Sequence, residues 1–331
     1  MSRDTRGNAP SGLIVVDKPG GLTSHDVVAR IRRLAGTRRV GHAGTLDPMA
    51  TGVLVVGVEK ATRLLGHLTL TDKEYQATIR LGQATDTGDA EGTVTTGRPA
   101  GQLSLAQVQA AAAALTGEIQ QVPPTVSAIK VAGRRAYQLT REGAPPVLKP
   151  RSVTVWSFTV QAVQPAPAGS PHTGSPHTGS PDTGSPGAGP PDTGPADPAP
   201  GDLLDVDVEV RCSSGTYIRA LARDMGEALG VGGHLTRLRR TRVGPYDLSA
   251  AHTLDELAAQ LTVLPLAQAA AAAFPVRKLT ADQARSLSHG GRLPGTGGET
   301  GPVAAFGPDG TLIALVQDKD GLARPLAVFV P

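Results

Sequence analysis

A single carboxylate, Asp47, stands in a segment whose residue types and spacing favour chemistry: Gly-His-Ala-Gly-Thr-Leu-Asp-Pro-Met-Ala-Thr-Gly, from Gly41 to Gly52. The residue before a proline is kept out of helical angles, so Pro48 predicts an extended or turn geometry for Asp47. The apolar run Val53–Val56 then predicts a buried strand. The pattern therefore presents an acid on a tight loop beside a packed sheet, where reactive groups tend to lie. A carboxylate in such a place can act as a nucleophile or as a base.

The segment resembles the signature of the TruB family of tRNA pseudouridine synthases, Gly-His-x-Gly-x-Leu-Asp-Pro-x-Ala-x-Gly. An isolated Leu-Asp-Pro is usually a turn or a helix cap, because Asp and Pro are ordinary turn residues. Five further segments extend the resemblance in the family's order: 12–26, 73–82, 121–130, 213–219 and 238–240. The resemblance implies that Asp47 is the catalytic nucleophile.

The same resemblance implies roles for five other side chains. Tyr75 would stack on the extruded uracil, and Leu238 would pack against it. Tyr217 would accept a proton near the ribose, and Arg219 would form an ion pair that keeps the nucleophile charged and aimed. His42 would enter the RNA loop at the place that the base leaves. Three of them have a plainer alternative: a core or edge-strand tyrosine for Tyr75, a phosphate or surface arginine for Arg219, a turn residue for His42.

Basic residues are unevenly distributed although the net charge is only +3. One cluster spans 30–39, a second spans 237–242, and no Lys or Arg lies between Arg151 and Arg211. Clustered guanidinium groups suit a phosphate-rich partner, and a salt-bridged surface is the alternative. Beside the Asp47 motif they favour RNA. Candidate RNA contacts are Lys18, Arg39, Lys130, Arg239 and Arg240. For Lys18 and Lys130 a structural role is the alternative, and neither is expected to be catalytic.

Converting uridine to pseudouridine breaks a C–N glycosidic bond and forms a C–C bond, so it needs neither redox chemistry nor phosphate energy. The sequence agrees, since it has neither a dinucleotide-type Gly-x-Gly-x-x-Gly nor a P-loop, and no cofactor is expected. Asp47 would act at the ribose or at the uracil ring. The target base must leave its stack, which costs a few kcal/mol, and stacking on an aromatic ring recovers about 1–3 kcal/mol.

Three other functions are alternatives to isomerisation. A non-catalytic tRNA-binding or folding chaperone would use the same surface but would not need Asp47. A guide-RNA-dependent relative is disfavoured by the chain length and the short segment before Leu13. A carboxylate hydrolase needs a second well-placed acid. Asp86 and Asp89 are expected to be solvated loop acids, so they do not supply it.

Composition sets the remaining expectations. The chain has 331 residues, 39% of them hydrophobic, and no apolar run approaches the roughly 20 residues that span a bilayer. Residues 1–10 are polar and unlike a signal peptide. Cys212 is the single cysteine and the eight histidines show no metal-ligand spacing, so no disulfide and no metal site are expected. We expect a cytoplasmic monomer whose partner is the tRNA T stem-loop, with no membrane and no obligate protein partner.

The resemblance implies an α+β catalytic fold with a largely antiparallel mixed sheet, followed by a small PUA-like RNA-binding domain. The expected organisation is a disordered N-terminus (1–10), a catalytic domain (11–273) and the C-terminal domain (274–331).

A Gly/Ser/Pro/Thr insert at 165–201 cannot bury enough apolar surface to become ordered, and it is expected to form a disordered loop at the tip of a hairpin. Residue patterns predict strands at 13–16, 53–56, 75–82, 153–160, 203–210, 303–306, 312–316 and 326–330, helices at 26–34 (capped by Thr23 or Ser24), 104–115 and 216–229 and one ending near 273, and a strand–turn–helix at 130–141.

Overall fold

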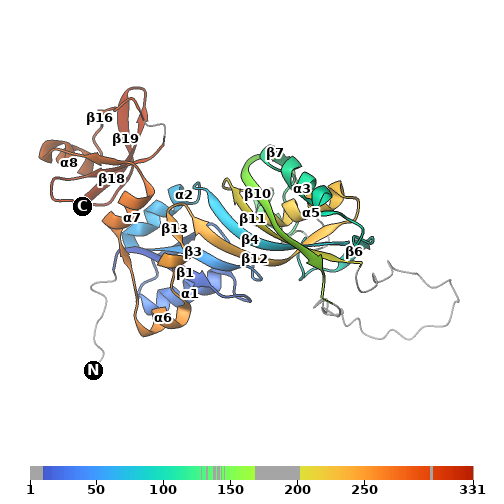
Figure 1. Cartoon of the computed structure of the whole chain (residues 1–331). Helices are drawn as coiled ribbons and strands as arrows, with labels where there is room; N and C mark the ends of the chain where they lie inside the picture. Colours follow the sequence, from blue (N-terminus) through green and yellow to red (C-terminus); the bar gives the residue numbers. More distant parts are fainter. Residues whose placement is uncertain are drawn as a thin grey trace. The chain divides into compact units, whose positions relative to one another are not determined.

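The computed structural model describes residues 10–127, 129–131, 133–136, 139, 142, 144, 146–167, 202–298 and 301–330. The chain divides into two compact units, coloured along the sequence in Figure 1. The first unit combines Met1–Lys73 with Arg239–Pro331, and the second unit is Glu74–Leu238. These spatial limits differ from the sequence limits 11–273 and 274–331, which stay predictions.

Strands β1 (Gly12–Lys18) and β3 (Thr51–Val58) are the central strands of the first unit. They pair antiparallel along their whole length, and both are mostly buried apolar runs. The opposite edge of β3 is shared by two strands. β2 (Val40–Ala43) pairs antiparallel with its C-terminal half, and β12 (Gly233–Val243) pairs parallel with its first two residues. The connection between β2 and β3, residues 44–50, therefore leaves the sheet beside β12.

Helix α1 (Ser24–Leu34) follows β1 and begins with a capping box. The Thr23 hydroxyl accepts from the backbone N–H of Asp26, and the Asp26 carboxylate accepts from the backbone N–H of Thr23. The predicted helix is confirmed, with Thr23 as its cap. Further elements of this unit are η1 (Glu59–Leu64), α2 (Leu65–Leu68), β13 (Tyr246–Asp247), η2 (Leu248–Ala250), α6 (Leu254–Ala259), β14 (Leu264–Pro265) and α7 (Leu266–Ala273).

A second, five-stranded sheet closes the first unit, with strand order β15-β17-β18-β19-β16. Alternate residues of β17 enter two different cores: Ala304 and Phe306 join the cluster around β1 and β3, whereas Val303 and Ala305 join a smaller cluster with α8. The predicted tail strands are confirmed with shifted ends, but α8 and the short strands were not predicted. The elements are β15 (Val276–Lys278), α8 (Ala281–Ser288), β16 (Leu293–Pro294), β17 (Val303–Phe306), β18 (Leu312–Lys319) and β19 (Leu322–Val328).

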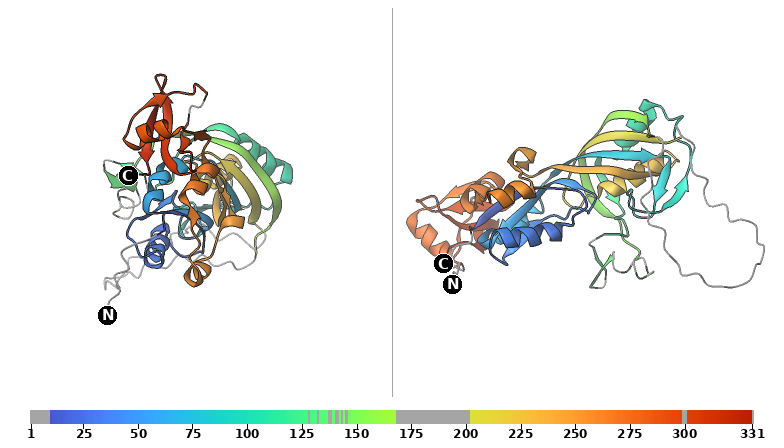
Figure 2. Two further views of the ribbon diagram at one scale, coloured as in Figure 1. Left: turned by 90° about the vertical axis from the view of Figure 1, so that its left-hand side faces the viewer. Right: turned by 90° about the horizontal axis from the view of Figure 1, so that it is seen from below.

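The second unit is built on the strand order β12-β4-β11-β10-β7, with its helices α3 and α5 beside the sheet (Figure 2). Counted through β12, which has residues in both units, the complete sheet has ten strands and reads β14-β1-β3-β12-β4-β11-β10-β7, with β2 and β13 off this path. Six strand pairs of this sheet are antiparallel: β1–β14, β1–β3, β2–β3, β7–β10, β10–β11 and β12–β13. The pair of β12 with β3 is parallel, so the predicted largely antiparallel mixed sheet is confirmed. The elements are β4 (Lys73–Leu81), β5 (Gln83–Thr85), β6 (Val94–Gly97), α3 (Leu105–Ala114), β7 (Gly117–Gln121), β8 (Lys130–Val131), β9 (Arg134–Arg135), β10 (Arg151–Pro165), β11 (Leu204–Cys212) and α5 (Ile218–Ala228).

Strands β10 and β11 form a long antiparallel hairpin that ends at the pair Pro165↔Leu204. The predicted insert, 165–201, begins at the last residue of β10, and β11 begins three residues after its predicted end. Residues 168–201 lie outside the described residues, so the expected disorder stays a prediction, as does that of residues 1–9.

Helix α3 begins after Ser104, whose hydroxyl caps it as predicted. Helix α5 begins two residues later than predicted, because Tyr217 has an extended backbone conformation and occupies the N-cap position. Of the predicted strand–turn–helix at 130–141, the strand and the turn are confirmed, but the turn leads into a second short strand, β9, which was not predicted. Much of the helical part, including Tyr137 and Arg141, lies outside the described residues.

Candidate active site

The loop of residues 44–50 carries Asp47 and joins β2 to β3. Gly44 opens it with a φ of 82°, in the left-handed region that glycine adopts freely. Ala50 closes it by donating its N–H to the Asp47 carbonyl at 3.1 Å. The side chain of Asp47 is half-buried. The predicted placement of this acid on a tight loop before a buried strand is confirmed.

The guanidinium of Arg240 binds the start of this loop from β12. It donates from Nη2 to Gly44 O at 3.1 Å, from Nη1 to Thr45 O at 3.5 Å, and from Nε to Val53 O at 2.8 Å. The side chain is 1% exposed. Arg240 therefore joins the loop to the strand that follows it, with its charge solvated by carbonyl groups instead of water.

Two more buried side chains bind the rest of the loop. The Ser24 hydroxyl accepts from Leu46 N at 2.9 Å and donates to Leu46 O at 3.1 Å. The Lys18 ammonium donates to Leu22 O at 2.6 Å and to Pro48 O at 3.1 Å. Each carbonyl from residue 44 to residue 48 thus accepts a hydrogen bond, and the backbone around the acid is fixed on both sides.

The prediction that Lys18 and Arg240 contact RNA does not fit these positions. Their side chains are 0% and 1% exposed, and their donors bind protein carbonyls. Both residues stabilise the loop that carries Asp47. The sequence showed their charge but not the burial that decides its use.

Gly52 has a structural reason to be glycine in the motif. Its φ is 97°, and a Cβ added there would lie 2.2 Å from the carbonyl oxygen of Arg240, its partner in the parallel pair. No other residue fits without moving β12 away from β3. The glycine therefore permits the close approach of the strand that supplies Arg240.

His42 lies on β2, opposite Val56 of β3, and not in a turn. Its ring is half-buried and stands 5.7 Å, centroid to centroid, from the ring of His25, at an angle of 82°. Burial, followed by the charges of His25 and Arg240, lowers the pKa of His42 below its ordinary 6.5, although a hydrogen bond with the Gly44 backbone opposes this. The neutral form of the imidazole is therefore favoured at pH 7.

Tyr217 belongs to the second unit, where Gln121 fixes its backbone. The Gln121 side chain accepts from Tyr217 N at 2.8 Å and donates to Tyr217 O at 3.1 Å. Gln121 is 1% exposed and ends β7. No local pattern predicts this role of Gln121, because its partner lies 96 residues away in the chain.

Arg219 lies in the first turn of α5 and is 5% exposed. It donates to Thr87 O at 2.7 Å and to Val126 O at 2.8 Å, and its Nε lies 3.6 Å from a carboxylate oxygen of Asp89. The prediction that Asp89 is a solvated loop acid is wrong: it is 4% exposed and is an ion-pair partner of this arginine. The predicted pairing of Arg219 with Asp47 stays a prediction.

Tyr75 and Leu238 are buried in the second unit, at 7% and 6% exposure. Tyr75 lies on β4, which is an interior strand between β12 and β11, so the edge-strand alternative is excluded. Their predicted contacts with the uracil stay predictions.

The other candidate RNA contacts differ in exposure. The side chain of Arg39 is 79% exposed, and its Nη1 lies 3.7 Å from Oε2 of Glu59. Arg239 forms a two-pronged ion pair with Asp17, at 3.1 and 2.7 Å, and its side chain is 30% exposed. The side chain of Lys130 lies outside the description.

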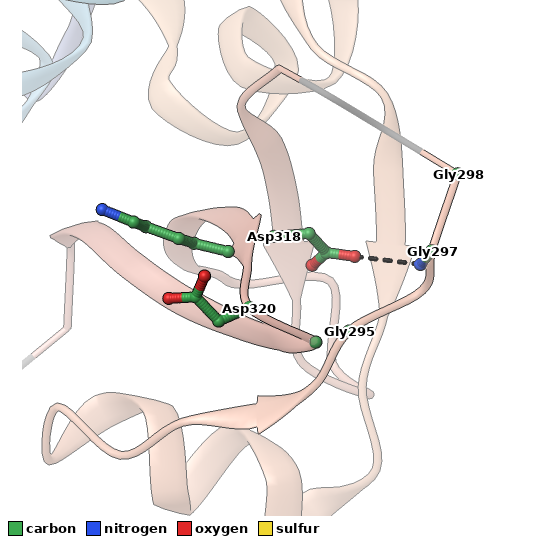
Figure 3. A pocket seen from close by; sticks show the side chains of 7 residues that line it. Gly295, Gly297, Gly298, Asp318 and Asp320 are labelled. Atoms are coloured by element: carbon green, nitrogen blue, oxygen red, sulfur yellow. Dashed lines mark hydrogen bonds between the residues drawn. The ribbon is translucent and has the colours of Figure 1, made fainter.

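A shallow cavity of about 430 Å³ lies in the C-terminal sheet, lined by glycines and by residues 318–321 (Figure 3). Asp318 accepts from Gly297 N at 3.0 Å and from Thr296 N at 2.6 Å, and these hydrogen bonds lower the pKa of its carboxyl. Asp320 binds Arg324 at 2.9 Å. The acids of this cavity stabilise two turns, and no predicted site residue lies here.

The described parts of the chain contain no helix long and apolar enough to cross a membrane. They contain no group of three His, Cys, Asp or Glu side chains placed to hold a metal ion.

The matches to family models and to a solved structure define the class. Residues 32–171 match the TruB family pseudouridylate synthase N-terminal domain, 219–269 the tRNA pseudouridylate synthase B C-terminal domain, and 274–330 the tRNA pseudouridine synthase II C-terminal domain. The chain also resembles a chain in the crystal structure of a Cbf5-Nop10-Gar1 complex, with a TM-score of 0.67 and 25% identity over 99% of this chain and 88% of that one. The large mixed sheet with its smaller C-terminal sheet is the fold of a pseudouridine synthase.

Curated relatives identify the family. The chain is 58% identical to tRNA pseudouridine synthase B of Thermobifida fusca, over 96% of this chain and 98% of the relative. It is 54% identical to tRNA pseudouridine synthase B of an Arthrobacter species, over 97% of each. The chain belongs to the TruB family of pseudouridylate synthases.

Proposed function

We propose that this protein isomerises uridine to pseudouridine at position 55 in the T loop of tRNA. The main support for this proposal is that Asp47 occupies the acid position of the motif, in a chain that is 58% identical to a tRNA pseudouridine synthase B. The fixed backbone on both sides of Asp47 supports this role, because a nucleophile or base acts only when its geometry is set beforehand.

The reaction breaks the bond from uracil N1 to ribose C1′ and forms a bond from uracil C5 to C1′. The C5 proton is lost and N1 gains a proton, so atoms and electrons balance without a co-reactant. Asp47 is the nucleophile, Tyr217 accepts a proton near the ribose, and Arg219 keeps the acid charged. The buried surroundings of Arg219 support a fixed position for its charge.

The target base leaves the stack before reaction, with Tyr75 stacking on it and Leu238 packing against it. His42 fills the place in the T loop that the base leaves, and its lowered pKa supports entry as a neutral ring. The exposed guanidinium of Arg39 and the partly exposed Arg239 contact the RNA backbone. Single-stranded loop bases and overall shape give the specificity.

The wider setting belongs to the same proposal. The protein acts in the cytoplasm as a monomer, with tRNA as its partner and without a cofactor or an obligate protein partner. Residues 11–273 form the catalytic domain, and 274–331 form a PUA-like domain that also binds RNA.

The test uses purified protein and an unmodified tRNA transcript that carries tritium at uridine C5. We expect tritium release with the wild-type chain and none with Asp47→Asn, which should bind the T arm within about tenfold of wild type, since little contact area changes. Asp86→Asn is the matched control, because it neutralises an exposed acid of the second unit and should leave release unchanged. Tight binding without release by the wild type would favour a tRNA chaperone instead. Full activity of Asp47→Asn would exclude the assigned nucleophile.

A further inference from the structure

The first turn of α1 contacts two functional positions at once. Ser24, 1% exposed, binds both the N–H and the C=O of Leu46, the residue directly before Asp47. Its neighbour His25 places its ring edge-to-face with the ring of His42. Adjacent residues of one turn therefore contact the residue before Asp47 and the ring of His42.

This turn is itself restrained from both ends. The capping box closes it, and the Thr23 hydroxyl also donates to the Asp26 carboxylate at 2.6 Å. Lys18 binds Leu22 O, just before the turn, together with Pro48 O, just after Asp47. Gly21 N also donates to Pro48 O, at 2.9 Å. The turn and the Asp47 loop are thus joined by hydrogen bonds before and after the acid.

We propose that the turn Thr23–Asp26 is a positioning element of the active site, in which Ser24 sets the orientation of Asp47 and His25 sets that of His42. The inference rests on the roles given to Asp47 and His42 in the proposed function. Neither Ser24 nor His25 acts on the substrate in this assignment. Each acts through the residue that it contacts.

Ser24 restrains the backbone directly before the acid. One hydroxyl binds both polar groups of Leu46, so these two hydrogen bonds fix the backbone on either side of that residue. The main chain enters Asp47 from this fixed residue, so the direction of its carboxylate depends on the hydroxyl. A displacement of about 1 Å at a reacting group costs on the order of a hundredfold in rate. Loss of the hydroxyl should therefore lower kcat and leave RNA binding nearly unchanged.

His25 restrains His42 through the ring contact. The His42 ring is half-buried, its Nδ1 is buried, and no hydrogen bond to that nitrogen is found among the described residues. The ring is then held by its hydrogen bond with the Gly44 backbone and by the perpendicular contact with His25. Edge-to-face ring pairs of this kind correspond to about threefold to tenfold in an equilibrium constant. Loss of His25 should therefore weaken RNA binding by that factor, with kcat at saturating RNA within about twofold.

The experiment compares Ser24→Ala, His25→Ala and His25→Phe with a control, Ser104→Ala. The control removes the cap hydroxyl of α3 in the second unit, so it perturbs a helix start without touching the loop. Multiple-turnover tritium release at saturating tRNA gives kcat effects, and RNA affinity is measured in the Asp47→Asn background. Hydrogen exchange of the Leu46 amide reports on the loop without any chemistry.

For Ser24→Ala we expect at least a tenfold lower rate, an affinity within twofold, and Leu46 exchange at least tenfold faster. Ser24→Cys keeps the side-chain volume and serves if the alanine variant does not fold. For His25 we expect the affinity loss in the alanine variant and its recovery in the phenylalanine variant, which keeps a ring edge. Ser104→Ala should change none of these readouts.

An unchanged rate in a folded Ser24 variant, or unchanged Leu46 exchange, would overturn the role of Ser24. Equal affinity of His25→Ala and wild type would overturn the role of His25. Absence of tritium release by the wild type would instead count against the proposed function, and the exchange rate of Leu46 would still decide whether Ser24 holds the loop.

Discussion

Two arginine-rich segments differ in how far the protein covers their side chains. In the segment 30–39 all five arginines are exposed, although Arg32 binds Val40 O and Arg39 lies 3.7 Å from Glu59. In the segment 237–242 only Arg237 is exposed, and each arginine has a partner within the protein: Asp207 for Arg237, Asp17 for Arg239, loop carbonyls for Arg240 and Asp72 for Arg242. The comparison teaches that a run of arginines indicates an RNA-binding surface only after the carboxylates and carbonyls near it have been located.

The largest effect on stability should come from Arg240, the most buried arginine of the segment 237–242. Arg240→Ala leaves the carbonyls of Gly44 and Val53 without their donor, so the free energy of unfolding should fall by about 3 kcal/mol or more. Arg240→Lys keeps the charge but loses the fork geometry, and should cost less. Urea denaturation followed by circular dichroism measures both. Wild-type stability in the alanine variant would mean that this arginine is not structural.

An intermediate effect is expected at the partly exposed ion pair of Arg239 with Asp17. A double-mutant cycle with alanine at both positions should give a coupling energy of about 0.5–1 kcal/mol, because the side chains are 30% and 26% exposed and solvent screens them. The pair of Arg242 with Asp72 is the matched comparison and should give a similar value. A coupling energy near zero for both pairs would mean that neither ion pair stabilises the fold.

The exposed segment should show little effect on stability and a clear effect on RNA. Arg38→Ala and Arg39→Ala should change the free energy of unfolding by less than about 0.5 kcal/mol. If each binds a phosphate, the slope of log affinity against log salt should fall by about 0.7–0.9 per residue. Arg211→Ala removes an exposed arginine of the second unit and should leave the slope unchanged. An unchanged slope in the Arg38 and Arg39 variants would make this cluster a merely solvated surface.

The smallest effect concerns the pKa of His42, which is lowered by burial and then by His25 and Arg240. In the unfolded chain His42 has its ordinary pKa of about 6.5, so as the pH falls below that value the unfolded chain takes up the proton more readily than the folded chain. The free energy of unfolding is therefore highest above about pH 6.5 and falls as the pH drops. The loss should be about 0.5 kcal/mol or less, since the side chain is partly exposed. His42→Asn should flatten the pH dependence of urea midpoints. His67→Asn is the comparison, because burial lowers that pKa too.

The sequence predicted the parts of the fold that local pattern determines. The run Val53–Val56 and the alternation in 75–82 gave the central strands, and the hydroxyls of Thr23 and Ser104 gave the helix starts. The short α8 was missed because it contributes a single fully buried residue, Leu287, and so lacks a strong apolar stripe.

The site was predictable in its identities but not in its contacts. The resemblance supplied Asp47 and His42, yet the use of Arg240 depends on carbonyls about 190 residues earlier in the chain. Asp89 lies in a turn-rich polar segment that predicts solvation, and only the approach of Arg219 explains its burial. Pairings of this kind come from the topology of the sheet, which no local pattern contains.

The pair Pro165↔Leu204 has a practical consequence for protein engineering. Two long strands meet there in fixed register, so what connects them has little influence on the sheet below, and the entropy of closing a loop grows only slowly with its length. The hairpin tip is therefore a permissive attachment point: a fluorescent protein, an affinity tag or a two-residue turn in place of the native connection should leave folding intact.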